Sequence, residues 1–556
     1  LLSTHPGQLQ DWNGQAYAWF PQVDVAQLRQ HLHLGADLLS GQGRLRLWSD
    51  IQRGEWASGS ADVDLHNVSL RLAPELEPLG FHQISGRLSG RHSAEDWSVA
   101  TQQLAFVSDQ GLTWPGGNLS AQYRHANARQ PAQGQVQGER LDLHIHTAPG
   151  ASAPGPGLRG AQLSAQFSQQ GGQLQLGMAE GGQIDWPGIL EDNSLPLQQL
   201  QTELRWQLRA HQIGQVQWKA QLRNDDLQGQ TQGQWQASAQ EGPGVLDLQA
   251  QVGRVDATRS HRYLPLLLSA EVRHYVRDSV RKGSVNKLQV RIKGDLARMP
   301  MAHPRDGEFR VSGHLQDVDL DYLPRSLAPT ASPPWPVLQG VQGDMVFERQ
   351  GMKFTGTGAR FGEGKQAIQV SALRASIPDL GHDPRLDLQA ELKGPAQQVL
   401  RTVQQSPLDQ MLSGALAQAS ASGNLQGKLR LNIPLLHSQD TRVQGSVALA
   451  GNDVQLNPHV PLLGRAQGTV QFSESGFALQ LLGGTSRLEG GLRSGAVPAG
   501  EPRLLIRAQG QVSADGLRAA RNLQPLDTLA RQARGQTSYS ATLGWRTRAG
   551  WQIAAT

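Results

Sequence analysis

Two pairs of histidines have a spacing that metal sites use. His144 and His146, like His31 and His33, are two residues apart and would share one face of a strand. A zinc site needs three or four protein ligands, but neither pair has a third candidate nearby and the chain contains no cysteine. We therefore expect no bound metal and no cofactor.

Three alternating aspartates form another candidate site. Asp317, Asp319 and Asp321 match the start of a calcium-binding loop, but the required glycine and closing glutamate are replaced by Tyr322 and Ala328. Apolar residues stand between the aspartates, so the segment is expected to be a strand whose carboxylates face water.

Catalytic motifs give no better candidate. Gly356-Thr357-Gly358, followed by Gly362, misses the dinucleotide-binding spacing and opens no helix. The chain has no G-x-S-x-G elbow and no P-loop. No catalytic residues are assigned, and the protein is expected not to be an enzyme.

The composition is polar without being highly charged. Lys and Arg number 51 against 47 Asp and Glu, a net charge of +4 that argues against a nucleic-acid binder. Hydrophobic residues make up 38% and charged residues 18%, whereas Gly, at 63 of 556 residues, is more common than usual. This composition does not suit a disordered tail or a helical bundle, and the absence of cysteine excludes disulfides.

The main pattern is an alternation of apolar and polar residues along most of the chain. Successive side chains of a strand point to opposite faces, so each such segment has one apolar and one polar face. Glycine-bearing turns between the segments predict an antiparallel meander. The apolar positions of the clearest segments are Leu45, Leu47, Val63, Leu65, Leu141, Leu143, Ile145, Leu204, Trp206, Leu208, Leu288, Val290, Ile292, Leu429, Leu431 and Ile433.

Few segments have helical periodicity. The clearest is His261–Lys282, which Gly283 ends and in which one apolar stripe contains Leu264, Leu268, Val272, Val276 and Val280. Two further helices are expected at Pro395–Leu412 and Asp515–Ala533, and a short one near Val23–Leu34.

The chain is expected to be one elongated array with soft divisions. We divide it into an N-terminal β-groove segment (1–150), a second groove segment (151–260), a central helix with its strands (261–394), and helix-plus-strand repeats that end in a truncated groove segment (395–556). The stretches Thr147–Gly160 and Pro324–Pro336 are expected to be loops because they are rich in proline and small residues.

A sheet with one apolar face must cover that face. A sandwich, a barrel and an open trough would all do so, but the apolar positions are thin and evenly spread, which favours the trough. We predict a mainly β fold: an elongated, twisted antiparallel sheet curled into a hydrophobic groove, with a few short α-helices. Such a groove suits acyl chains, whose exposure to water costs about 0.8 kcal/mol per CH₂.

A series of short motifs around and after the central helix carries a family resemblance. In chain order they are Tyr263-Leu264-Pro265, Gly283-Ser284-Val285, Lys293-Gly294-Asp295-Leu296, Met299-Pro300-Met301, Asp306-Gly307-Glu308-Phe309, Leu320-Asp321-Tyr322, Trp335-Pro336, Leu431-Asn432-Ile433-Pro434-Leu435, Leu456-Asn457-Pro458, Pro461-Leu462-Leu463 and Gly483-Gly484. In this order, over about residues 240–490, the chain resembles the YhdP group of the AsmA-like family of Gram-negative envelope proteins. Residues 325–334 depart from that pattern and look like an insertion.

The resemblance implies a bridge-like lipid transporter. Members of the family have an inner-membrane N-terminal helix and a periplasmic β-groove that moves phospholipid towards the outer membrane. The implied partners are phospholipids, the inner membrane, and outer-membrane or other envelope proteins, with no nucleic acid. The chain begins at Leu1 rather than Met, so we expect a fragment whose membrane helix lies outside it.

Several alternatives remain open from sequence. A periplasmic chaperone or scaffold for outer-membrane protein assembly would hold strands at the sheet edges or in the trough. A β-solenoid adhesin would show a fixed repeat of about 20–30 residues, which is absent. The central helix is expected either to cover the groove or to pack on the sheet. Its basic residues Arg273, Arg277, Arg281 and Lys282 are expected to meet lipid head groups or simply water.

Overall fold

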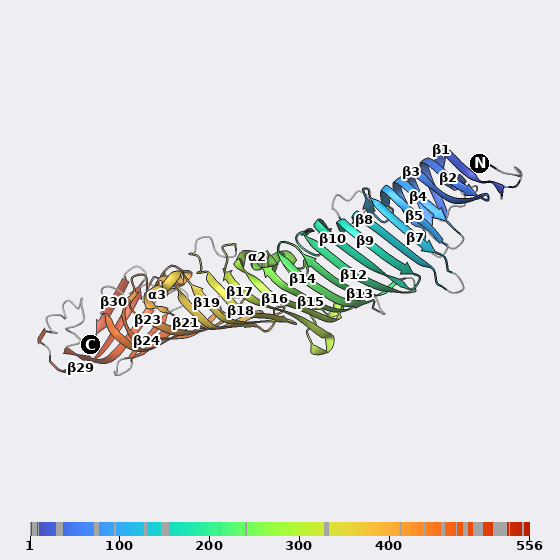
Figure 1. Ribbon diagram of the computed structural model, residues 1–556. Helices are drawn as coiled ribbons and strands as arrows, with labels where there is room; N and C mark the ends of the chain where they lie inside the picture. Colours follow the sequence, from blue (N-terminus) through green and yellow to red (C-terminus); the bar gives the residue numbers. More distant parts are fainter. Residues whose placement is uncertain are drawn as a thin grey trace.

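The chain forms one long antiparallel sheet that runs from end to end of the molecule (Figure 1). The computed structural model describes all residues except 1, 3–7, 9–10, 29–36, 72–76, 94–95, 127–129, 146–154, 211, 239–241, 327–332, 412–413, 437–439, 457–461, 474, 482–486, 493–503, 515–530, 533, 547–549 and 556.

The strands of the N-terminal half are β1 (Gly14–Asp24), β2 (Asp37–Gln52), β3 (Glu55–Arg71), β4 (Leu79–His92), β5 (Asp96–Ser108), β6 (Leu112–Trp114), β7 (Asn118–Arg124), β8 (Gln133–Ile145), β9 (Gly157–Ser168), β10 (Gly171–Asp185), β11 (Ser194–Leu197), β12 (Gln199–Arg209), β13 (Gln212–Arg223), β14 (Leu227–Gln236) and β15 (Val245–Asp256). Those of the C-terminal half are β16 (Val280–Asp295), β17 (Gly307–Leu320), β18 (Leu338–Glu348), β19 (Gly351–Phe361), β20 (Ile368–Ile377), β21 (Arg385–Pro395), β22 (Ser420–Ala421), β23 (Asn424–Pro434), β24 (Arg442–Gln455), β25 (Leu463–Ser473), β26 (Gly476–Leu481), β27 (Arg487–Leu492), β28 (Leu504–Ser513), β29 (Gln536–Arg546) and β30 (Gly550–Ala555). The helices are α1 (Val25–Leu28), α2 (Ala270–Ser279), α3 (Ala396–Gln404) and α4 (Pro407–Met411), with 3₁₀ turns η2 (Ala257–Tyr263), η3 (Leu296–Arg298), η4 (Pro304–Asp306) and η5 (Gly364–Gln366).

The topology is a meander in which consecutive strand positions pair antiparallel. Three positions hold an interrupted strand: β6 and β7 both pair with β5 and β8, β11 and β12 both pair with β10, and β22 and β23 both pair with β24. The predicted fold class, an elongated antiparallel sheet with a few short helices, is confirmed. The four segments expected from the sequence remain a prediction.

The cross-strand register keeps one face apolar from strand to strand. On β23, Leu429 and Leu431 stand opposite Ala390 and Leu388 of β21, whereas Arg430 stands opposite Gln389. Because side chains alternate with a period of two, this in-register pairing lines up apolar residues on one face and polar residues on the other.

A line of β-bulges bends the strands. In six strands a non-glycine residue adopts a positive φ of 46–54° beside a register shift, and the next residue is buried on the apolar face. The six pairs are Asn67-Val68, Gln103-Leu104, Arg140-Leu141, Asp317-Val318, Ala372-Leu373 and Arg465-Ala466. Two residues opposing one bend the bulged strand and increase its twist.

Glycines opposite two of these bulges permit the bend. A Cβ on Gly86 would lie 2.8 Å from the Cα of Leu104, and one on Gly283 would lie 2.6 Å from the Cα of Val318. Both distances are too short for any side chain. The glycine therefore determines where the bulged strand can approach its neighbour.

Other glycines lie beneath aromatic rings of the adjacent strand. Trp218 lies over Gly233, and Phe472 lies over Gly445, so closely that a Cβ on either glycine would lie within 2.5 Å of a ring carbon. A ring lying flat on a glycine covers two positions of the apolar face at once. This arrangement explains part of the glycine excess noted in the sequence.

The apolar face lies on the inner side of the curled sheet. Trp114, Leu141 and Ala161 are 0–2% exposed, although all thirty strands belong to one sheet and, among the described residues, no second sheet covers them. A flat single layer would leave such side chains in water. The sheet must therefore bend around its own apolar face, at the line of bulges.

The two long edges of the sheet differ. The connections β1–β2, β15–β16 and β21–β23 contain helices α1 to α4, and all three lie on one edge, here called the helix rim. The opposite edge, here called the turn rim, has tight turns such as β9–β10 and β18–β19 together with longer connections such as β16–β17, which contains η3 and η4. Figure 1 shows α2 and α3 along the same side of the sheet.

The helices differ in part from those expected. The predicted helix His261–Lys282 was too long: Ala257–Tyr263 is a 3₁₀ turn, α2 covers only Ala270–Ser279, and Val280 begins β16. Pro265 disfavours helix at Leu264, and pairing of Val280 with Leu320 ends it.

The other predicted helices have varied outcomes. Pro395–Leu412 contains α3 and α4, and α1 occupies part of Val23–Leu34. Most of Asp515–Ala533 lies outside the described residues. In the part of the chain that the structure describes, no helix has the length and apolar character to span a membrane.

We expect the chain in solution to be far longer than a compact globule. Thirty strands, three of them interrupted, at about 4.8 Å spacing give a sheet on the order of 120 Å long. A compact protein of this length would have a radius of gyration of about 24 Å. Small-angle scattering should give a clearly larger value, and a value near that of a globule would contradict the extended sheet.

Candidate functional site

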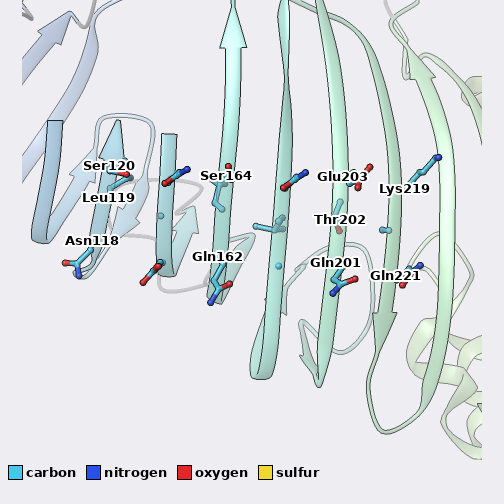
Figure 2. A pocket seen from close by; sticks show the side chains of 18 of the residues that line it. Asn118, Leu119, Ser120, Gln162, Ser164, Gln201, Thr202, Glu203, Lys219 and Gln221 are labelled. Atoms are coloured by element: carbon cyan, nitrogen blue, oxygen red, sulfur yellow. The ribbon is translucent and has the colours of Figure 1, made fainter. Parts of the chain in front are cut away.

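A hollow of about 1080 Å³ lies along the sheet from β4 to β15. Most of its lining residues belong to the polar face of the strands, such as Gln162, Ser164 and Glu203. The residues between them, such as Leu163, have their side chains on the apolar face. Figure 2 shows labelled side chains of the hollow, such as Gln162, Gln201 and Gln221, in rows across adjacent strands. The site is thus a long surface rather than a point at which a few residues converge.

On the apolar face of the same strands lies a continuous file of cross-strand partners. Leu119 pairs with Gly138, Gly138 with Leu163, Leu163 with Leu176, and Leu176 with Thr202. The file continues through Ala220 and Thr231 to Ala250. None of the residues in this file is charged, so the register keeps charges off this face.

The apolar face of these strands is long enough for long apolar ligands. The strands from β4 to β15 occupy ten positions, or roughly 40 Å at about 4.8 Å each. A bilayer core of about 30 Å accommodates two acyl chains end to end. Whole acyl chains lying along the sheet therefore match the extent of this face.

The predicted lining residues all lie on this apolar face, at different depths. Cross-strand pairs such as Leu45 with Val63, Leu204 with Trp218 and Val290 with Val311 join them to apolar partners. Four are buried: Leu45, Val63, Leu65 and Leu141. Eleven are half-buried: Leu47, Leu143, Leu204, Trp206, Leu208, Leu288, Val290, Ile292, Leu429, Leu431 and Ile433. Ile145 is exposed. Their contact with lipid stays a prediction.

The β15–β16 connection runs back along the helix rim. Leu266 N–H donates to the carbonyl of Ile189, 2.9 Å away, in the loop after β10. Arg262 pairs with Asp192 at 2.5 Å and with Asp226 at 2.6 Å. This connection therefore ties together the rim ends of strands from β10 to β16.

Buried polar groups strengthen that link. Arg273 of α2 is 8% exposed and pairs with Glu191 at 3.3 Å. Hydrogen bonds from His274 and Arg273 lower the pKa of Glu191, because they stabilise its ionised form. The Tyr263 hydroxyl donates to Asp226, and burial raises the pKa of Tyr263 to about 12.

The apolar stripe of the expected central helix is split. Leu268 and Val272 are exposed, 38% and 47%, whereas Leu264 and Val276 are half-buried. Val280 belongs to β16 and packs on the apolar face. The buried residues of α2 are polar, Arg273 and Ser279. A role of these residues as a groove cover stays a prediction.

A family model described as YhdP protein matches residues 3–154 and 145–549 of the chain. The chain belongs to the YhdP family. Over 231 residues it is 24% identical to a protein of Escherichia coli (strain K12) named intermembrane phospholipid transporter YhdP. That alignment covers 41% of this chain and 17% of the relative, so the chain spans only a small part of the relative's length. No solved structure matches the chain.

Several groove residues of this YhdP-family chain were missed by the sequence analysis. Trp114 and Met178 are buried on the apolar face, and so are the residues that follow the bulges, such as Val318 and Leu373. The sequence does contain a signal for them: at each bulge the apolar–polar alternation is interrupted, and two residues instead of one stand between consecutive apolar positions. Strict alternation was the wrong template at these points.

The candidate metal ligands have other partners. Asp317 pairs with Lys282 at 2.7 Å, and Asp321 pairs with Arg281 at 2.8 Å. Asp319 accepts the backbone N–H of Gly340. His144 lies 3.6 Å from Asp185, while His31, His33 and His146 are outside the described residues. No cluster of three metal-ligating side chains occurs in the described ranges.

Leu141 and Ile145 share the apolar face of β8 but should differ in energetic role. Leu141 is 2% exposed at a bulge, so Leu141→Ala should lower the local free energy of unfolding by about 2–5 kcal/mol. Ile145 is 43% exposed, so Ile145→Ala should change it by less than about 0.5 kcal/mol. Hydrogen exchange of the β8 and β9 amides measures both. Equal loss of protection in the two variants would contradict the assignment of Leu141 to the bend.

Proposed function

We propose that this chain is a segment of a non-enzymatic phospholipid conduit between the inner and outer membranes of a Gram-negative cell. The observation that carries the proposal is the apolar face that the cross-strand register keeps along the sheet, from Leu45 opposite Val63, through Leu204 opposite Trp218, to Leu388 opposite Leu431. The printed name of the related protein, an intermembrane phospholipid transporter, supports the same cargo.

The groove would lower the cost of moving a lipid through water. Each exposed CH₂ costs about 0.8 kcal/mol, so two long acyl chains in water cost on the order of 20 kcal/mol. Half-buried residues such as Leu204, Val290 and Leu431 would replace that water with apolar contact at every strand. The head group would remain outside the groove, because burying an unpaired charge costs several kcal/mol more.

The proposed transfer needs no covalent chemistry. A lipid that slides from strand to strand exchanges one set of apolar contacts for an equivalent set, so no intermediate is trapped. The proposed location is the periplasm, with anchoring to the inner membrane by a helix outside this chain. The proposed partners are the phospholipids and the two membranes, with envelope proteins at either end.

Strand β23 provides the test of this function. Leu431→Glu should abolish lipid transport, because it places an unpaired carboxylate on the groove floor opposite Leu388 and Val443. Arg430→Glu should be tolerated, because Arg430 is exposed on the other face. Transport is measured in cells that make the natural protein with each change, at matched abundance.

A photo-crosslinker at the same two positions gives an independent readout. Position 431 should capture phospholipid and position 430 should not. Capture of unfolded outer-membrane protein at 431 would instead support the chaperone alternative. Equal lipid capture at both positions, or equal tolerance of both charges, would overturn the proposed function.

A further inference from the structure

A second hollow, of about 510 Å³, lies on the helix rim beside α2. It is built from η2, from the end of α2 with the start of β16, and from the segment after β17. Four of its lining residues are arginines, namely Arg259, Arg277, Arg281 and Arg325, whereas its one carboxylate is Asp278. The hollow is therefore strongly cationic.

Two of the arginines are held by carboxylates. Arg277 pairs with Asp278 at 2.9 Å, and Arg281 pairs with Asp321 at 2.8 Å. Ser326 also donates to Asp278, 2.6 Å away. Asp278 is thus fully engaged by groups of the hollow itself.

The other two arginines are available to a ligand. Arg259 and Arg325 are both exposed, and within the described residues neither has a carboxylate within ion-pair distance. They come from η2 and from the segment after β17, parts of the chain more than sixty residues apart. Guanidinium groups bind phosphate oxygens through paired N–H donors.

The cationic hollow adjoins the apolar face of the groove. Val280 lines the hollow and also packs against the buried cluster that contains Val285 and Val318. Leu320, the cross-strand partner of Val280, packs against the same cluster. An apolar floor and a set of arginines therefore meet at one point of the rim.

We infer that this hollow binds the phosphate of a phospholipid whose acyl chains lie in the groove. The inference rests on the proposed function and adds a head-group site to it, with Arg259 and Arg325 as the phosphate ligands. Arg277 and Arg281 complete the cationic wall. The site favours lipids that have an anionic phosphodiester over neutral lipids with the same acyl chains.

The test compares two lipids that differ only in the head group. The purified chain is mixed with dodecyl maltoside micelles containing equal amounts of phosphatidylglycerol and diacylglycerol, and native mass spectrometry counts each bound lipid. Wild type should prefer phosphatidylglycerol. In the double variant Arg259→Gln/Arg325→Gln that preference should fall about tenfold, while the total bound lipid stays constant.

A matched control removes two arginines elsewhere. Arg205→Gln/Arg430→Gln changes exposed residues on the polar face of β12 and β23 and should keep the full preference. Arg259→Lys/Arg325→Lys keeps the charge without paired donors and should give an intermediate value. Unchanged melting temperatures show that the variants are folded.

Each outcome has a separate meaning. If lipid binds but Arg259→Gln/Arg325→Gln keeps the preference, the head-group site is wrong while the proposed function stands. If no variant and no wild-type chain binds lipid, the proposed function fails. If glycerol 3-phosphate binds wild type as tightly as phosphatidylglycerol, the hollow is a site for soluble phosphate esters, and the inference is overturned.

Discussion

The structure depends on one constraint: a single sheet with one apolar face must remove that face from water without a second layer of protein. The thirty strands form one sheet, and no other sheet occurs among the described residues. The sheet meets the constraint partly by bending, which buries residues such as Trp114 and Ala161 almost completely. What bending leaves uncovered is a long half-buried floor, the surface assigned here to lipid.

The six bulges lie near the helix-rim ends of their strands. Polar residues such as Asn67, Gln103 and Asp317 adopt a left-handed backbone conformation that costs roughly 1–2 kcal/mol each. Burial of the following residue, about 1.5–3 kcal/mol for Val or Leu, offsets that cost. The strained backbone at each bulge is therefore stable because the bend buries the apolar residue that follows it.

The difference between the two rims gives the groove two unlike sides. Helices α1 to α4 lie in connections of the helix rim, whereas the turn rim combines tight turns with connections that contain only 3₁₀ turns η3 and η4 among the described residues. The β15–β16 connection links β10 with β16 through Arg262 and Arg273. The same connection, with the segment after β17, forms the cationic hollow. Head groups at the helix rim and acyl chains on the apolar face would then be separated along the direction of the strands.

Local periodicity was sufficient to predict much of this protein. The alternation in Leu429-Arg430-Leu431 assigns faces without any knowledge of neighbours, because the period of a strand is a property of its own backbone. The length of the sheet and the scarcity of helices follow from the same pattern.

Only the tertiary structure decided how deep each apolar residue lies and where strands bend. Leu141 and Ile145 have the same alternation, yet one is buried at a bulge and the other is exposed at a strand end. Val280 continues a helical stripe in the sequence but pairs with Leu320, since ladder hydrogen bonds with β17 outweigh local helix propensity. Arg259 and Arg325 line the same hollow because distant strands pair, which no local pattern encodes.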